Sequence, residues 1–269
     1  MKQLIAIFVC VLIPSAACAG RPEGFQQPAD TATIQLAPLK QLRKGVDLWP
    51  LIANASSPAE QRVNSTLTRL NQRLTKAVQD CDVSARESIK EMGSAAGPHD
   101  KVSEDWTRTV EVTMAGPRFL SLVASDELFC GGAHPDNDQM AMVFDMTTGA
   151  PVNWITLVAK SAAPSALTDS VADGSTMGAL VLPALRKRLV DAADADCKDA
   201  FQDPQGFLLW PDAKHETVVA QPFDLPHVVQ ACANEIDLTI DQARKLGFDE
   251  SLLTAIQEAH RRLPAAAKH

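Results

Sequence analysis

The sequence predicts an α+β fold in which antiparallel β-hairpins form a sheet packed with several helices, in two intertwined subdomains. Three observations predict this class: a helix-period apolar stripe early in the chain, strand-period alternation in its middle, and helix-capping motifs near its end. The apolar share of 46% is ordinary for a globular protein. We therefore expect a helical N-terminal subdomain over 34–105 and an α+β subdomain over 106–269.

A long helix is predicted in the first subdomain. Ser57-Pro58-Ala59-Glu60 has the pattern of a capping box, with proline at the first helical position, where its missing N–H is not needed. Apolar residues then recur every three or four positions, at Val63, Leu67, Leu70, Leu74 and Val78. This spacing predicts a helix over about 58–80 that packs one face on a core, with Cys81 just past its end.

Strands dominate the middle of the chain. From Trp106, apolar residues Val110, Val112 and Met114 alternate with polar residues Thr109, Glu111 and Thr113, which predicts a strand with one solvent-exposed face. After a turn at 115–118, the near-continuous apolarity of 119–124 predicts a strand away from the sheet edge. A strand at 140–144, a turn at 145–149 and a partner strand at 152–157 would complete the antiparallel hairpins.

The last third mixes helices and strands. A helix is expected over 177–193, in which Pro183 either kinks the helix or marks its first turn. Short strands are expected at 206–210 and 217–220. Thr239 begins a second capping box with Gln242, Gly247 suits the position after a helix end, and Asp249 suits the N-cap of a terminal amphipathic helix.

Residues 1–19 have the order of a secretory signal peptide: positive charge, apolar run and small-residue cleavage site. The apolar run at 4–13 is too short to span a membrane, and no later segment is apolar enough to do so. Cleavage after Ala19 would leave a flexible tether at 20–33 and a periplasmic or secreted protein. A lipoprotein anchored through Cys18 is an alternative that the sequence leaves open.

Four cysteines follow the leader: Cys81, Cys130, Cys197 and Cys232. An even number behind a signal peptide favours two disulfides. Of the three possible pairings we favour Cys81 with Cys130 and Cys197 with Cys232, because each pair ties one half of the chain together. Their spacing fits no zinc template, and the net charge of −8 argues against a nucleic-acid partner.

The segment 129–138 holds the densest group of candidate functional residues. Gly131 and Gly132 permit positive φ and close backbone approach, which suits a ligand-facing loop or a tight bend between strands. His134 is a candidate general base that would act with Asp136 or Asp145 in a hydrolase. The same histidine in a loop is compatible with a purely structural role.

Other sequence features argue against resident metals and cofactors. Asp136 and Asp138 resemble the opening of a calcium loop, but the further ligands are missing at the required offsets. Dinucleotide and P-loop signatures are absent too, so we expect neither a metal nor a cofactor. Trp106 and Trp154 lie in strand patterns and are expected in the core rather than on a sugar-stacking surface.

The segment Cys130-Gly131-Gly132-Ala133-His134-Pro135, followed by Phe144-Asp145-Met146-Thr147-Thr148-Gly149, resembles a bacterial extracytoplasmic domain family. The signature of that family is G-G-A-H and then an aromatic-Asp hairpin that ends in T-G. The family includes the lysozyme-receiving outer part of an anti-sigma factor and the accessory domain of a peptidoglycan deacetylase. The resemblance covers about 110–157 and implies an α+β envelope module without known catalytic activity. The usual tyrosines of the family are absent, since this chain has no Tyr.

We therefore expect an exported, non-catalytic binding module for a cell-wall-related ligand, either a lysozyme-like muramidase or a peptidoglycan fragment. The acidic net charge would steer a cationic muramidase toward it. The candidate ligand-binding residues are Gly131, Gly132, His134, Asp136 and Asp145. An envelope hydrolase using His134 with a nearby Asp and an envelope structural or assembly factor are the alternatives, and the oligomeric state is not indicated.

Overall fold

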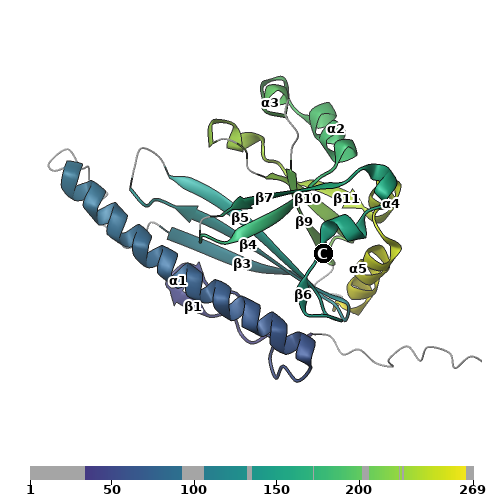
Figure 1. The fold of residues 1–269 in the computed structure, drawn as a ribbon, viewed down its shortest axis with the longest axis horizontal. Helices are drawn as coiled ribbons and strands as arrows, with labels where there is room; N and C mark the ends of the chain where they lie inside the picture. Colours follow the sequence, from purple (N-terminus) through teal and green to yellow (C-terminus); the bar gives the residue numbers. More distant parts are fainter. Residues whose placement is uncertain are drawn as a thin grey trace, which may run out of the picture. The chain divides into compact units, whose positions relative to one another are not determined.

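The computed structural model describes residues 34–92, 106–131, 135–171, 173–201, 206–223, 225 and 227–264. The leader at 1–19, the tether at 20–33, Gly132 and His134 lie outside these residues. The described residues belong to one unit, Ala32–His269, built from two antiparallel-rich sheets packed with several helices (Figure 1). This arrangement confirms the predicted α+β class.

The first sheet has six strands in the order β1-β2-β3-β4-β5-β6. Neighbouring strands pair antiparallel except β2, which lies parallel to β3. The near-continuously apolar β4 lies inside the sheet, as predicted. The strand bounds are Gln41–Arg43 (β1), Val46–Asp47 (β2), Trp106–Ala115 (β3), Phe119–Leu128 (β4), Asp136–Asp145 (β5) and Ala150–Pro151 (β6).

The second sheet has five antiparallel strands in the order β11-β10-β9-β8-β7. Strand β9 contacts β3, β4 and β5, so the second sheet packs on part of the first. Buried apolar side chains from both sheets belong to one large core. The bounds are Ser165–Ser170 (β7), Thr176–Val181 (β8), Gly206–Asp212 (β9), Thr217–Phe223 (β10) and Ile236–Thr239 (β11).

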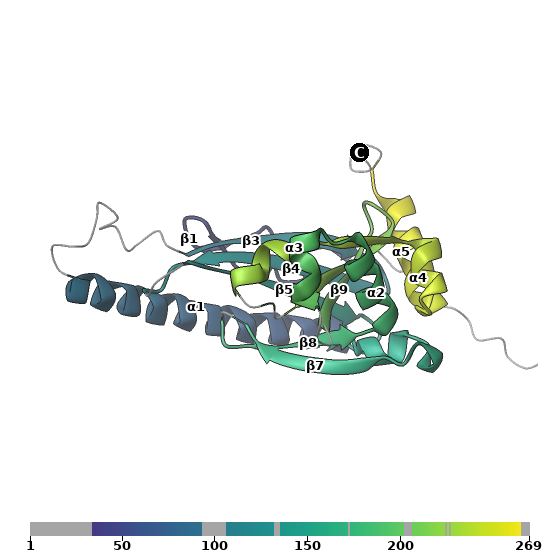
Figure 2. The same ribbon diagram turned by 90° about the horizontal axis from the view of Figure 1, so that it is seen from above.

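The long helix α1 runs beside the first sheet (Figures 1 and 2). Both capping-box hydrogen bonds between Ser57 and Glu60 form at its start. The predicted end near residue 80 was wrong, because buried Cys81 and Ala85 continue the apolar stripe and the helix extends to Met92. The helices are Pro58–Met92 (α1), Pro183–Ala192 (α2), Ala195–Lys198 (α3), Ile240–Lys245 (α4) and Glu250–Arg262 (α5).

The predicted helix over 177–193 was wrong in its first half. Residues Thr176–Val181 form β8, which pairs with β7 and β9, and Pro183 occupies the first turn of α2. A proline without an N–H fits this position and disfavours a helix that would pass through it. The capping box of Thr239 with Gln242, the positive φ of Gly247 and the N-cap at Asp249 agree with prediction.

The predicted strand at 152–157 was also wrong. After the short β6, Trp154–Leu157 form a 3₁₀-helix (η3), and Trp154 is partly buried there rather than in a strand. The side chain of Asn153 accepts a hydrogen bond from the backbone N–H of Ile155 at 3.2 Å. Such a local bond offers the backbone an alternative to strand pairing.

A β-bulge alters the expected alternation in β3. Trp106 is buried as expected, but the register of β3 on β4 shifts between Val112 and Met114. The extra residue interrupts the alternation, so that Thr113 and Met114, which follow one another, are both buried. Val112, just before the shift, is 42% exposed, whereas Thr113 is buried and its hydroxyl lies 2.6 Å from that of Ser121.

Both predicted disulfides form. Cys81 of α1 bonds to Cys130 after β4, and Cys197 of α3 bonds to Cys232 at the end of the 3₁₀-helix His227–Cys232 (η6). Disulfides of this kind are typical of an oxidising, non-cytoplasmic compartment. Among the described residues, no helix is long and apolar enough to cross a membrane.

Candidate functional site

Of the predicted site residues, Gly131 is placed against helix α1. Its φ is +84°, and an added Cβ would overlap the hydroxyl of Ser88. Glycine is therefore required for the close approach of this loop to the helix, next to the disulfide of Cys130. This contact gives Gly131 a packing role in the described structure.

Asp136 and Asp145 lie at opposite ends of β5. Nine residue steps at about 3.3 Å each separate them by about 30 Å. Asp136 accepts a hydrogen bond from the backbone N–H of Asn137, while Asp145 accepts one from Thr147 and pairs with Arg118 at 3.0 Å. The structure therefore does not bring the two aspartates together, and Asp145 builds the hairpin turn that follows β5.

An acidic groove lies where the second sheet begins to cover the first. It is a cavity of about 270 Å³ lined by residues of β3, β4, β5, β9, β10 and β11. Among its described lining residues there is no Lys or Arg. The residues that give it its charge are the carboxylates Glu111, Asp212, Glu235 and Asp237, next to His215.

The floor of the acidic groove is apolar and fixed. Val123, Trp210 and Val219 are buried there, because β4, β9 and β10 direct these side chains into the core between the sheets. Thr113 of β3 adds to the same lining, in alternation with Thr109 and Glu111. The carboxylates therefore surround a buried apolar floor.

The four carboxylates differ in how strongly the protein holds them. Asp212 accepts hydrogen bonds from the backbone N–H groups of Lys214 and His215, and its other oxygen lies 2.7 Å from the His215 ring. Glu235 accepts a hydrogen bond from Gln139 at 3.3 Å. Within the described part of the chain, the carboxylates of Glu111 and Asp237 have no hydrogen-bond or ion-pair partner, and both residues are exposed.

Like charges gathered without a counter-ion create a negative potential that extends into solvent. The described residues contain no group of three or more Asp, Glu, His or Cys close enough to hold a metal ion. The carboxylates of the acidic groove are thus spread apart, which suits several separate cationic groups on a partner better than one small ion.

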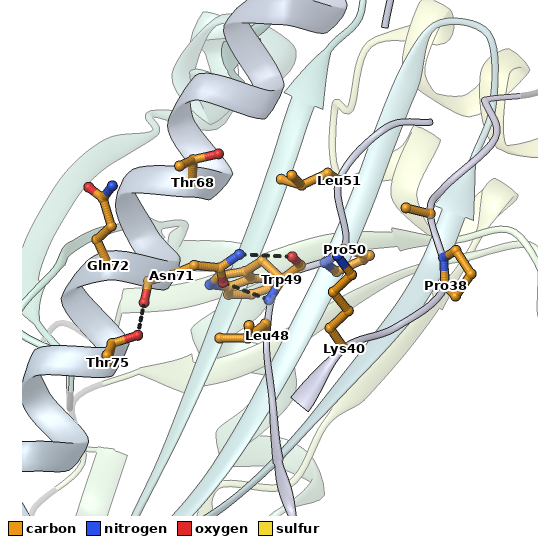
Figure 3. Close-up of a pocket in the computed structure, with 11 residues that line it drawn as sticks. Pro38, Lys40, Leu48, Trp49, Pro50, Leu51, Thr68, Asn71, Gln72 and Thr75 are labelled. Carbon is orange, nitrogen blue, oxygen red and sulfur yellow. Dashed lines mark hydrogen bonds between the residues drawn. The ribbon is translucent and has the colours of Figure 1, made fainter. Parts of the chain in front are cut away.

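A second, mostly apolar groove lies between residues 37–51 and α1 (Figure 3). Asn71 pairs with the backbone of Trp49 through two hydrogen bonds of 2.8 and 3.0 Å, and Asn64 pairs with Ile52 through bonds of 2.7 and 3.0 Å. From Asn64 to Asn71 the helix rises about 10.5 Å, and from Trp49 to Ile52 the extended chain spans about 10 Å. The two pairs of hydrogen bonds therefore have matching spacing along the helix and along the N-terminal segment. These contacts fix the N-terminal segment on α1.

A buried ion pair lies between α1 and the first sheet. Arg108 donates to Asp126 at 2.8 Å, and both side chains are 0% exposed. The indole of Trp106 donates to the other oxygen of Asp126 at 2.7 Å, and Arg108 stacks on Trp49 at 4.9 Å from the ring centre. Burial raises the pKa of Asp126 above its ordinary value, against the opposing effect of Arg108.

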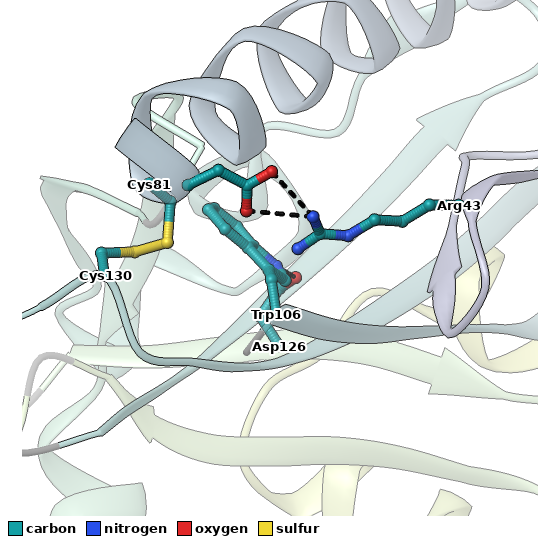
Figure 4. The surroundings of a disulfide bond; sticks show 6 residues. Arg43, Cys81, Trp106, Asp126 and Cys130 are labelled. Atoms are coloured by element: carbon teal, nitrogen blue, oxygen red, sulfur yellow. Dashed lines mark hydrogen bonds and ion pairs between the residues drawn. A yellow bond between two sulfur atoms is a disulfide. The ribbon is translucent and has the colours of Figure 1, made fainter. Parts of the chain in front are cut away.

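The disulfide between Cys81 and Cys130 lies beside the indole of Trp106 (Figure 4). On the other side of that indole, Arg43 pairs with Asp82 of α1 at 2.9 Å. The disulfide and this ion pair both attach α1 to the sheet. Trp106 belongs to a small core with Val46, Leu74, Val78 and Cys81.

The acidic groove was not predicted from the sequence. Its carboxylates come from strands about a hundred residues apart, and each alone is typical of a solvent-exposed face. No protein-family model matches this chain, and comparison with curated proteins gives no match either.

Proposed function

We propose that this protein is an exported, non-catalytic binding module whose acidic groove engages a cationic cell-wall-related protein, a lysozyme-like muramidase. The single observation that carries the proposal is the cluster of four carboxylates in a groove whose described lining holds no Lys or Arg. Glu111 and Asp237 are exposed and unpaired among the described residues, so they are available to a basic partner.

The charge of the groove favours a basic protein over a peptidoglycan fragment. Muramic acid and wall peptides carry carboxylates of their own, and like charges placed together across an interface are costly. A cationic protein would instead be attracted by the groove and by the net charge of −8. The two disulfides support a periplasmic or secreted location for this encounter, and lipid anchoring through Cys18 is compatible with it.

Calorimetric titration of residues 20–269 with a lysozyme panel tests the proposal. We expect saturable binding that weakens at least about tenfold when salt rises from about 50 to about 200 mM, because exposed charges are screened. The double variant Glu111→Gln/Asp237→Asn should weaken binding at least about tenfold at low salt.

A matched control changes the same net charge elsewhere. Glu87 and Glu91 are exposed on α1, and the variant Glu87→Gln/Glu91→Gln should bind as the unmodified protein does. An equal loss in both double variants would mean that overall charge, not the groove, attracts lysozyme, and would overturn the proposal. Binding of muropeptides without binding of any lysozyme would do so as well.

A further inference from the structure

A cleft distinct from the two grooves described above lies next to the Cys81–Cys130 disulfide. This disulfide cleft has a volume of about 600 Å³ and is lined by α1, by the ends of β3 and β4 and by the turn between β7 and β8. Trp106 lines it, whereas Thr109 and Glu111 of the same strand line the acidic groove. Alternate residues of a strand point to opposite faces, so the two sites lie on opposite faces of the first sheet.

Asp173 lines the disulfide cleft with an incompletely satisfied carboxylate. Its residue is only 5% exposed, and one oxygen accepts a hydrogen bond from the backbone N–H of Ser175 at 2.8 Å. The other oxygen, Oδ2, is buried and has no hydrogen-bond partner among the described residues. A buried carboxylate oxygen without a donor is unfavourable, so a donor supplied by a ligand would be strongly favoured there.

The buried guanidinium of Arg108 does not pair with Asp173. Arg108 is engaged with Asp126, and the negative charge of Asp173 acts on Asp126 through space. These three buried groups therefore comprise two carboxylates and one guanidinium. One more positively charged donor would balance them.

The rim of the cleft carries charge of the opposite sign. Arg73 and Lys76 of α1 both line it, and Lys76 pairs with Asp80 at 2.6 Å. Within the described structure, Arg73 is exposed and has no ion-pair or hydrogen-bond partner. A purely cationic ligand would be repelled by Arg73, and a purely anionic one would be repelled by Asp173.

We propose that the disulfide cleft binds a short zwitterionic peptide, with its ammonium group beside the carboxylate of Asp173 and its carboxylate at Arg73. The volume lies within the usual range of about 300–1,000 Å³ for ligand sites. Ala77 and Leu128, both partly buried, provide apolar contact for the body of the peptide.

Blocked peptides test each end of the ligand separately. Trialanine is titrated into residues 20–269 by calorimetry, beside N-acetylated trialanine and trialanine amide. We expect trialanine to bind, and each blocked form to bind at least about tenfold more weakly, because each lacks one charge. Equal binding of all three peptides, or no saturable binding of trialanine, would overturn the proposal.

Variants then assign each charge to a residue. Asp173→Asn should abolish the preference for a free ammonium group, and Arg73→Gln should abolish the preference for a free carboxylate. Arg69→Gln, one turn earlier on α1 and outside the cleft, should change neither preference and serves as the control. Unchanged preferences in Asp173→Asn and Arg73→Gln would contradict the assignment.

The proposal for the disulfide cleft and the proposed function of the acidic groove can be disproved independently of each other. Asp173→Asn should leave lysozyme binding unaltered, because Asp173 lies across the sheet from the groove. If Asp173→Asn does not fold, the peptide series on the unmodified protein still decides whether both charges are recognised.

Discussion

Gly149 packs so closely on Ala59, in the first turn of α1, that a Cβ added at Gly149 would overlap the backbone carbonyl of Ala59. At the other end of the helix, Gly131 makes an equally close approach to Ser88. The two glycines flank β5, one before it and one after it. Helix α1 is therefore contacted near both of its ends by loop residues, one after β4 and one after β5.

Gly149→Ala should lower the free energy of unfolding by more than the strain of a left-handed backbone alone. Gly149 and Gly174 have φ of +71° and +73°, but an added Cβ overlaps Ala59 at the first and meets nothing within 4 Å at the second. We expect Gly174→Ala to cost about 1–2 kcal/mol for its left-handed backbone and Gly149→Ala to cost clearly more. Urea denaturation measures both free energies of unfolding. Equal losses would show that the contact with Ala59 relaxes freely.

Asn71→Ala should lower the free energy of unfolding by about 1–3 kcal/mol, because it leaves the N–H and C=O of buried Trp49 without partners. Asn64→Ala should have a similar effect at Ile52. Gln72 is the control, since it is exposed on the same helix and lines the same groove, and Gln72→Ala should stay within about 0.5 kcal/mol. A loss at Gln72 as large as at Asn71 would contradict the role assigned to the amide pairs.

Removing one member of the buried ion pair should be costly. Arg108→Met leaves the carboxylate of Asp126 buried with Trp106 as its remaining donor, and we expect a loss of about 3–5 kcal/mol. The double variant Arg108→Met/Asp126→Leu buries no unpaired charge and should lose less than the single variant. Chemical denaturation compares them, and a double variant less stable than Arg108→Met would refute this account.

Asp126 should also make stability depend on pH. Because burial raises its pKa in the folded state, the native protein keeps this proton at pH values where the unfolded chain has released it. The contribution of Asp126 to stability therefore declines as pH rises from its ordinary pKa of 3.8 through the folded value.

The variant Asp126→Asn isolates this contribution, since an amide does not titrate in the same range. We expect the stability of the unmodified protein relative to Asp126→Asn to fall as pH rises from about 4 to about 7. Urea denaturation of both proteins across this range measures the difference. A relative stability that rises with pH would mean that Arg108 outweighs burial and lowers the pKa.

Features set by neighbouring residues were predictable from the sequence. The capping boxes at Ser57 and Thr239 depend on side chains three positions apart, so both were recognised without knowledge of the fold. The disulfide pairing was predicted from the simple grouping of cysteines by halves of the chain. The continuation of α1 beyond residue 80 was also visible in the sequence, since Cys81 and Ala85 follow Val78 at helical spacing.

Features set by distant residues were not predictable. The apolar residues of 176–181 suit a helix or a buried strand equally, and their pairing with β7 and β9 decides for the strand. The acidic groove depends on β9, β10 and β11 packing on the first sheet, which brings Asp212 to Glu111. Of the candidate residues, Gly131, Asp136 and Asp145 could be placed; Gly131 contributes to packing, and Asp145 builds the turn after β5.

The connectivity of the disulfides has a consequence for how the chain matures. Among the four cysteines of the described residues, each bond joins one cysteine to the next along the chain, Cys81 to Cys130 and Cys197 to Cys232. In the export proposed above, the chain would emerge from its N-terminal end, so both thiols of the first pair would be present before the third thiol arrives. An oxidant that couples thiols in order of arrival therefore produces the native bonds directly, without later isomerisation.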